Sequence, residues 1–236
     1  MPRLRPALAL LVAVSVLVLG LTGCTKPKPQ SSAPTGDLPD GATLVKDSAT
    51  AMRDIKTAKF QITADATVAG LALKKAEGTL TREGSAQGTA QVDQGGLNVE
   101  LTFVIVGDKI YLKGPTGGYQ TLPLSLAAAV YDPSAILDPD RGIAKVLGSV
   151  TDAKTEAQES VDGKPAWRVA VKANGDDLSA IIPGVTGTVP GKIWIGTTDK
   201  RLLKAAFTLP GSGDAKGGTV TVVFTDFDQP VNISAP

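Results

Sequence analysis

The chain has 236 residues, with 24 basic and 23 acidic side chains, no histidine and one cysteine. Without histidine, a Ser-His-Asp triad, a Cys-His pair and an imidazole ligand for zinc are excluded. A net charge of +1 and few aromatic residues (five Phe, two Trp, three Tyr) argue against a nucleic-acid partner, which needs a basic surface and stacking rings. The length suits one domain of ordinary size, or at most two small ones.

Residues 1–23 have the pattern of a secretory signal peptide. Arg3 and Arg5 precede fifteen uncharged, mostly apolar residues from Ala7 to Leu21, too few to span about 30 Å of hydrocarbon comfortably. The segment ends in Leu21-Thr22-Gly23-Cys24, which matches a bacterial lipobox. We therefore expect cleavage before Cys24 and attachment of a diacylglyceryl group to its thiol. The alternative is a lone buried cysteine after an uncleaved anchor.

Cleavage at this point would define the location of the mature protein. It would remove 23 of the 236 residues, leaving 213 with a net charge of about −1. Each acyl CH₂ buried in a bilayer contributes about 0.8 kcal/mol, so two chains anchor stably without a membrane-spanning helix. We expect an extracytoplasmic domain, lipid-anchored to the cell membrane and free of internal disulfides. Residues 24–39, rich in Pro and Ser, are expected to form an extended tether, and residues 40–236 the domain.

The first elements of the domain are one helix and a series of strands. A helix is predicted after Asp40, because apolar residues from Leu44 to Ile55 recur at helical spacing. From Phe60 the period changes to two, and alternating segments joined by short Gly-rich turns continue to Leu112. This pattern predicts an antiparallel meander of five strands.

The second half contains a helical insert and further strands. Between Leu122 and Val150 the alternation stops, and two short helices are predicted, over 124–130 and from Pro133 through Leu147. Strands are predicted within 154–161, 167–171, 193–195, 202–209 and 219–227, with a short helix at 176–182. Nearly ten strands with grouped helices predict an α+β fold, with a strongly curved antiparallel sheet or an open barrel.

No motif for catalysis or metal binding emerges. The chain lacks a Gly-x-Ser-x-Gly elbow, a Ser-x-x-Lys pair and a glycine-rich phosphate loop. Asp138-Pro139-Asp140-Arg141-Gly142 resembles the start of a calcium loop, but its twelfth position would be Ser149 where a bidentate Glu is required. We therefore expect no enzyme activity, no metal and no cofactor.

The first strands are unusual for the small size of the residues on one face. These residues are Ala64, Ala66, Ala76, Gly78, Ala86, Gly88 and Ala90. A face of small side chains leaves volume that inserted helices must fill, or else it encloses a cavity, which costs on the order of 24 cal/mol per Å³ when empty. Two interpretations stay open: close helix packing, or an apolar cavity of lipid size.

Several motifs resemble the mycobacterial LppX/LprA/LprF/LprG lipoprotein family. They include the lipobox and its tether, Gly70-Leu71, Val130-Tyr131-Asp132-Pro133, the segment Ile136 to Gly142, and Lys192-Ile193-Trp194-Ile195. The closing Thr225-Asp226-Phe227 also matches, although family members usually carry Trp where this chain has Phe227. The similarity runs over almost the whole chain.

The resemblance implies a half-barrel like that of the LolA and LolB carriers, with helices on the concave side enclosing an apolar cavity. It implies a non-catalytic carrier of acylated lipids, such as triacylated glycolipids, phosphatidylinositol mannosides, lipoarabinomannan or triacylglycerol, which it moves toward the outer envelope in cooperation with an exporter. Ala90 falls where the family has valine beside the pocket opening. The alternative function is a surface lipoprotein with a structural or signalling role through protein partners.

We expect the cavity to be lined by apolar residues from the first helix, the strands and the helical insert. They are Leu44, Met52, Ile62, Ala64, Ala66, Leu80, Ala90, Val92, Val99, Leu101, Phe103, Val130, Ile136, Val146 and Val169.

Overall fold

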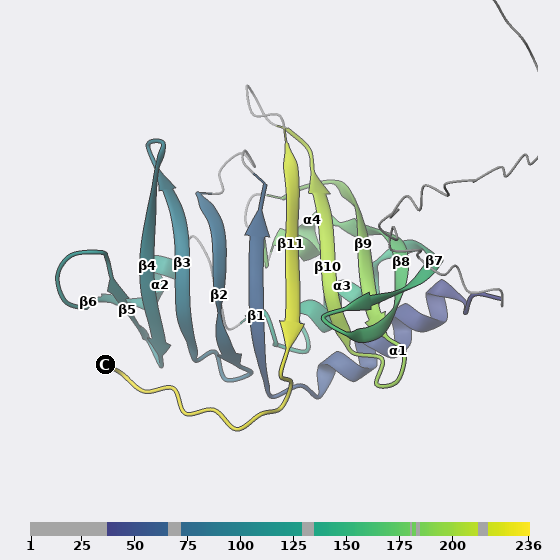
Figure 1. Ribbon diagram of the computed structural model, residues 1–236, viewed down its shortest axis with the longest axis horizontal. Helices are drawn as coiled ribbons and strands as arrows, with labels where there is room; N and C mark the ends of the chain where they lie inside the picture. The colour runs from purple at the N-terminus through teal and green to yellow at the C-terminus, as the bar shows by residue number, and fades with distance from the viewer. Residues whose placement is uncertain (1–36, 66–71, 129–134, 180, 183–184, 212–216) are drawn as a thin grey trace, which may run out of the picture. The chain divides into compact units, whose positions relative to one another are not determined.

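A single antiparallel sheet of eleven strands dominates the structure, a computed structural model (Figure 1). The structure describes residues 37–65, 72–128, 135–179, 181–182, 185–211 and 217–236. The strand order is β6-β5-β4-β3-β2-β1-β11-β10-β9-β8-β7, so two meanders join where β1 pairs with β11. The sheet does not close, because β6 and β7 each have one neighbour. The predicted open antiparallel α+β fold is confirmed, with eleven strands in place of about ten.

The strands are β1 (Thr57–Ala64), β2 (Leu73–Thr81), β3 (Ala86–Gln94), β4 (Leu97–Val106), β5 (Lys109–Lys113), β6 (Gln120–Pro123), β7 (Thr151–Val161), β8 (Lys164–Asn174), β9 (Thr188–Gly196), β10 (Leu202–Leu209) and β11 (Gly218–Thr225). The helices are α1 (Gly41–Arg53), α2 (Leu124–Ala128), α3 (Ile143–Ser149) and α4 (Gly175–Ser179). None of the helices within the described residues has the length and apolar character needed to cross a bilayer.

Helix α1 begins where the sequence predicted. The Asp40 carboxylate accepts a hydrogen bond from the backbone N–H of Thr43 at 2.8 Å, which satisfies one of the free donors of the first turn. The predicted apolar stripe, from Leu44 to Met52, is the buried face of the helix. Its acidic and basic residues lie on the exposed face, so α1 is amphipathic as expected.

Both ends of α1 are attached to the sheet. Before the helix, the Thr155 hydroxyl of β7 donates to the carbonyl of Pro39 at 2.6 Å. After it, the Arg82 guanidinium donates to the carbonyls of Arg53 and Ile55, the latter at 2.9 Å, and so satisfies acceptors that the helix leaves free. Since one attachment is to β7 and the other to the turn after β2, α1 is held at both ends.

The strand registers give the sheet an apolar inner face and a polar outer face. On the inner face Phe60 lies opposite Gly78, Gly78 opposite Gly88, and Gly88 opposite Phe103. A Cβ on either glycine would collide with the backbone of the facing strand, so β2 and β3 require glycine at this crossing. Polar residues such as Gln61 occupy the alternate positions on the outer face.

The Lys192 to Ile195 motif follows the same alternation. Ile193 and Ile195 are fully buried, whereas Lys192 and Trp194 belong to the outer face. The indole N–H of Trp194 donates to Glu159 at 2.7 Å, and the Lys204 ammonium lies 4.5 Å from the centre of the indole ring. The motif thus ties β9 to β7 and β10 on the outer face.

The helical insert differs from the prediction. Residues 135–142 form turns, and α3 begins only at Ile143. A Cβ at Gly142 would collide with the carbonyl groups of Ala135 and Ile136, so this tight turn depends on glycine and cannot continue a helix from Pro133. Pro133 itself lies outside the described residues. Strand β6 was not predicted, and α4 ends at Ser179 instead of Ile182.

Candidate functional site

A small apolar cavity lies between the inner face of β1 and β9–β11 and the helices α3 and α4. Every residue that lines it is hydrophobic, and its volume is about 40 Å³. The lining residues are Phe60, Ile62, Ile136, Ile143, Val146, Leu147, Val150, Leu178, Ile181, Ile182, Ile193, Leu202, Ala205, Phe207, Val222 and Phe224. The cavity therefore offers no group that could hold a proton, a metal or a charged ligand.

The size of the cavity corrects the expectation of a preformed lipid-sized space. A water molecule needs roughly 10–15 Å³, whereas pockets for small ligands commonly have about 300–1,000 Å³. At about 40 Å³ this cavity is far below that range. In the observed conformation the helices pack closely against the sheet and leave no space of acyl-chain size in this cavity.

The predicted lining residues divide into groups. Ile62, Ile136 and Val146 do line the cavity. Four others are buried elsewhere in the same hydrophobic core: Leu44, Met52, Leu80 and Val169. Three are partly buried against that core: Ala64, Ala90 and Phe103. Three more share the inner face of β3 and β4 and are half-buried: Val92, Val99 and Leu101. Ala66 and Val130 lie outside the described residues.

Six of the sixteen lining residues come from β9–β11, strands that were not expected to line the cavity. Phe60 of β1 and residues of β9–β11 such as Ile193, Phe207 and Phe224 form its sheet side. Alternation in these strands was visible in the sequence, but it does not show which strands lie beneath the helices. The small-residue face of β2 and β3 lies beside the cavity and does not form its wall.

The inner face of β2–β5 is less covered by helices than the inner face of β7–β9. Helices α1, α3 and α4 contact β7, β8 or β9, whereas α2 contacts β5 and β6 (Figure 1). Along β4 the inner-face residues pass from the buried Ile105, 4% exposed, through half-buried Phe103, Leu101 and Val99 to Leu97, which is 71% exposed. This stripe, Leu97 to Ile105, is an apolar surface that connects the core with solvent.

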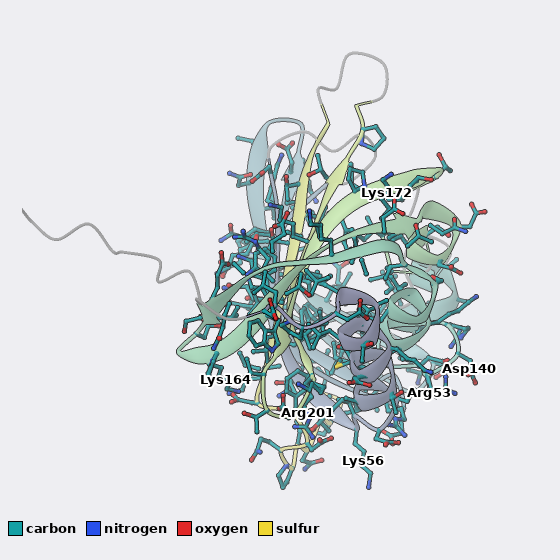
Figure 2. The ribbon with its side chains drawn as sticks, turned by 90° about the vertical axis from the view of Figure 1, so that its right-hand side faces the viewer. Arg53, Lys56, Asp140, Lys164, Lys172 and Arg201 are labelled. Carbon is teal, nitrogen blue, oxygen red and sulfur yellow. The ribbon has the colours of Figure 1, made fainter. Side chains whose placement is uncertain are left out.

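Ion pairs join the helices that cover the cavity. The Lys145 ammonium of α3 lies 3.2 Å from the carboxylate of Asp177 in α4. The Ser149 hydroxyl and Lys145 hold the pKa of Asp177 below its usual value of 3.8, although partial burial opposes the shift. Arg53 of α1 and Asp140 lie side by side, 3.0 Å apart (Figure 2). The second pair is largely exposed and contributes little.

A wider groove of about 1010 Å³ opens between α1, α3 and the start of β7. Its lining includes the charged side chains of Lys46, Arg53, Asp140, Lys145 and Asp152. Charged groups are costly to cover with hydrocarbon, so this groove is unsuited to acyl chains.

The described residues contain no group of three or more His, Cys, Asp or Glu side chains placed to hold a metal ion. Cys24, the predicted lipidation site, lies outside the described residues. The hydrophobic lining of the cavity suits an apolar ligand, and the described residues form no catalytic centre.

Comparison with known proteins identifies relatives. The LppX_LprAFG lipoprotein family matches residues 40–233. The lipoarabinomannan carrier protein LprG of Mycolicibacterium smegmatis is 34% identical over 97% of this chain and 94% of its own length. LprG of Mycobacterium tuberculosis is 29% identical, again over 97% of this chain and 94% of its own length. The crystal structure of LprF from Mycobacterium bovis has a TM-score of 0.73 at 23% identity, covering 84% of this chain and 98% of LprF, and shows the same fold. The M. tuberculosis lipoprotein LppX has a TM-score of 0.61 at 17% identity, covering 82% and 97%.

Proposed function

Since this chain belongs to the LppX_LprAFG lipoprotein family, we propose that it carries acylated glycolipids or lipoglycans across the cell envelope. Candidate cargoes are triacylated glycolipids, phosphatidylinositol mannosides, lipoarabinomannan and triacylglycerol. The carrier names of the LprG relatives support this proposal. We further propose that the chain is anchored through diacylglyceryl-Cys24, so that it works beside the membrane that supplies the lipid, and that an exporter cooperates with it.

The observation that carries the proposal is the purely hydrophobic interior beneath α3 and α4, which shares the sheet's inner face with the partly uncovered stripe on β4. Acyl chains move from bilayer to protein at little net cost, because both environments are apolar. No chemical step is needed, and transfer is reversible. The polar headgroup stays outside, because the cavity offers it no partner.

Because the cavity is too small for an acyl chain, lipid binding must be coupled to a movement of the helices that lie over it. Helix α1 is attached at one end to β7 and at the other to Arg82, in the turn after β2, whereas α3 and α4 are joined to each other by Lys145 and Asp177. We therefore infer that α3 and α4 move together away from β9–β11, and that α3 slides along α1, the helix against which it mainly packs. Lipid then replaces the helix–sheet contacts that were lost.

The test uses the mature chain, from residue 24, with Cys24→Ala so that it is not acylated. Organic extraction and mass spectrometry should find bound acyl lipid, and the delipidated protein should bind added phosphatidylinositol mannoside. Ala90→Trp should lower lipid binding while the chain stays folded, because Ala90 lies opposite Leu101 and the indole would cover the apolar stripe of β4. Gln91→Trp, on the exposed outer face of the same strand, is the matched control.

The small cavity favours a second candidate, a structural or signalling lipoprotein with a solid core and protein partners. In that case no lipid would co-purify or bind. Ala90→Trp would then act as overpacking and reduce the free energy of unfolding by about 1–3 kcal/mol, with no effect on lipid binding.

A further inference from the structure

The hairpin that joins β3 to β4 ends in an exposed leucine. Leu97 is 71% exposed, more than any other exposed large hydrophobic residue in the described part of the chain. It follows directly after Gly95 and Gly96, which both have positive φ angles and form the tight turn. A single exposed leucine is ordinary, whereas one that continues a contiguous apolar surface points to an interaction site.

Leu97 lies at the outer end of the apolar stripe. The side chains of Leu97, Val99, Leu101, Phe103 and Ile105 share one face of β4, since alternate residues of a strand point the same way. Their exposure falls from 71% at Leu97 to 4% at Ile105. The stripe therefore leads from the tip of the hairpin to the hydrophobic core.

The tip has a single charged side chain, Asp93. No Lys, Arg, Asp or Glu occurs between Asp93 and Glu100. Asp93 accepts a hydrogen bond from the N–H of Gly96 at 2.9 Å and lies 3.9 Å from the Lys74 ammonium. Because this carboxylate is already paired, the tip can enter the interface of a bilayer without burying an unpaired ion.

The chain that leads to the predicted anchor enters the domain at the same end of the sheet. Pro39 is bound to Thr155 in the middle of β7, and Gly41 lies against Ala153, near the start of that strand. The registers connect the start of β7 to the end of β8, the start of β9, the end of β10, the start of β11, the end of β1, the start of β2 and finally the end of β3. The entry point of the chain and the β3–β4 hairpin thus lie at corresponding strand ends of one sheet.

The length of the tether permits contact. Thirteen residue steps separate Cys24 from Asp37, which reach at most about 47 Å when fully extended. Seven strand spacings separate β7 from β3, or about 34 Å. A contact made by one leucine is weak, and the anchor would strengthen it by holding the domain at high effective concentration over the membrane. The contact is therefore measured on the unanchored chain with vesicles at high lipid concentration.

From these observations we propose that the β3–β4 hairpin docks on the lipid bilayer, with Leu97 inserted at the interface and the stripe Leu97 to Ile105 serving as the path of the acyl chain toward the core. This inference rests on the proposed carrier function. The partner is a lipid surface; a second copy of the chain or a protein partner at Leu97 is an outcome that the test can reveal.

The first experiment places a fluorescent probe at the tip. Cys24→Ala removes the only cysteine of the chain, so Leu97→Cys can be labelled with an environment-sensitive dye. On addition of phosphatidylcholine vesicles the emission should shift to the blue. Leu126→Cys is the matched control: Leu126 is 65% exposed, and its helix α2 begins beside Asp108, at the opposite end of β4. Its emission should not change.

The second experiment removes the apolar side chain without adding a charge. Leu97→Asn should reduce partitioning of the unlabelled Cys24→Ala chain onto the same vesicles about tenfold, equivalent to about 1.4 kcal/mol, and Leu126→Asn should not. An unresponsive label at position 97, equal responses at both positions, or a monomer–dimer shift in sedimentation caused by Leu97→Asn would each overturn the proposal.

Failure of this inference is distinguishable from failure of the carrier function. A protein that contains extractable lipid but whose position 97 ignores vesicles remains a carrier that docks elsewhere. A protein that docks through Leu97 but neither contains nor binds acyl lipid is not a carrier, although its hairpin is a membrane contact.

Discussion

Filling the apolar cavity should stabilise the empty protein and weaken its binding of lipid. Ala205 of β10 lines the cavity and is 6% exposed. Ala205→Val adds two methyl carbons to this space, and a β-branched residue suits a strand. The added carbons therefore fill the cavity, which would have to become larger to hold an acyl chain.

The magnitude follows from the cavity volume. At about 24 cal/mol per Å³, a cavity of about 40 Å³ costs about 1 kcal/mol. Ala205→Val should raise the free energy of unfolding by about this amount, which corresponds to an increase in Tm of roughly 2–4 °C for a domain of this size. If lipid binds only when the cover opens, stabilising the closed state by 1 kcal/mol lowers lipid affinity about fivefold.

Urea unfolding of the delipidated protein and titration with phosphatidylinositol mannoside measure the two effects. The control is Ala206→Val, because Ala206 is the next residue of β10 and belongs to the outer face; its effect on stability should stay within about 0.5 kcal/mol. A destabilised Ala205→Val protein would show that the cavity is not free space in solution. Greater stability with unchanged lipid affinity would refute the coupling between opening and binding.

Three further substitutions test the cover and the core. The pKa of Asp177 is lowered in the folded chain, so the ionised carboxylate stabilises the fold above pH 3.8, and this stabilisation is lost as the pH falls through the folded pKa. Asp177→Asn should therefore lower the urea midpoint at about pH 7 and leave it unchanged near pH 2. Ser48→Ala should raise the free energy of unfolding by about 1 kcal/mol, because this fully buried hydroxyl has no hydrogen-bond partner among the described residues. Arg82→Ala should reduce it by about 1–2 kcal/mol, measured by urea unfolding, and increase hydrogen exchange in the last turn of α1, because the carbonyls there lose their donor.

The elements that the sequence predicted well are those with a local signal. Asp40 marks the start of α1 because its carboxylate must meet a free N–H three residues later, a requirement contained within one turn. The alternation from Phe60 to Leu112 identified β1–β5 because adjacent strands joined by short turns pair with each other. These inferences need no knowledge of the rest of the chain.

The candidate site was harder to predict, because it depends on contacts between distant segments. Small residues such as Gly78 and Gly88 suggested empty volume, but they serve the close crossing of β2 and β3. The cavity is instead surrounded by large residues, Phe207 and Phe224 among them, where the helices do not fill the space above β10 and β11. Side-chain size along one strand does not determine how closely another element approaches it.

The two ends of the open sheet have a consequence for a protein that the proposed lipid anchor would hold at high density on one surface. Unpaired strand edges are templates for sheet extension between molecules. Here β6 has four residues and ends in Pro123, while β7 is interrupted by two register shifts and carries Asp152, Lys154 and Glu156. Irregular, charged borders of this kind discourage polymerisation, so neighbouring molecules crowded in two dimensions remain individual and free to diffuse.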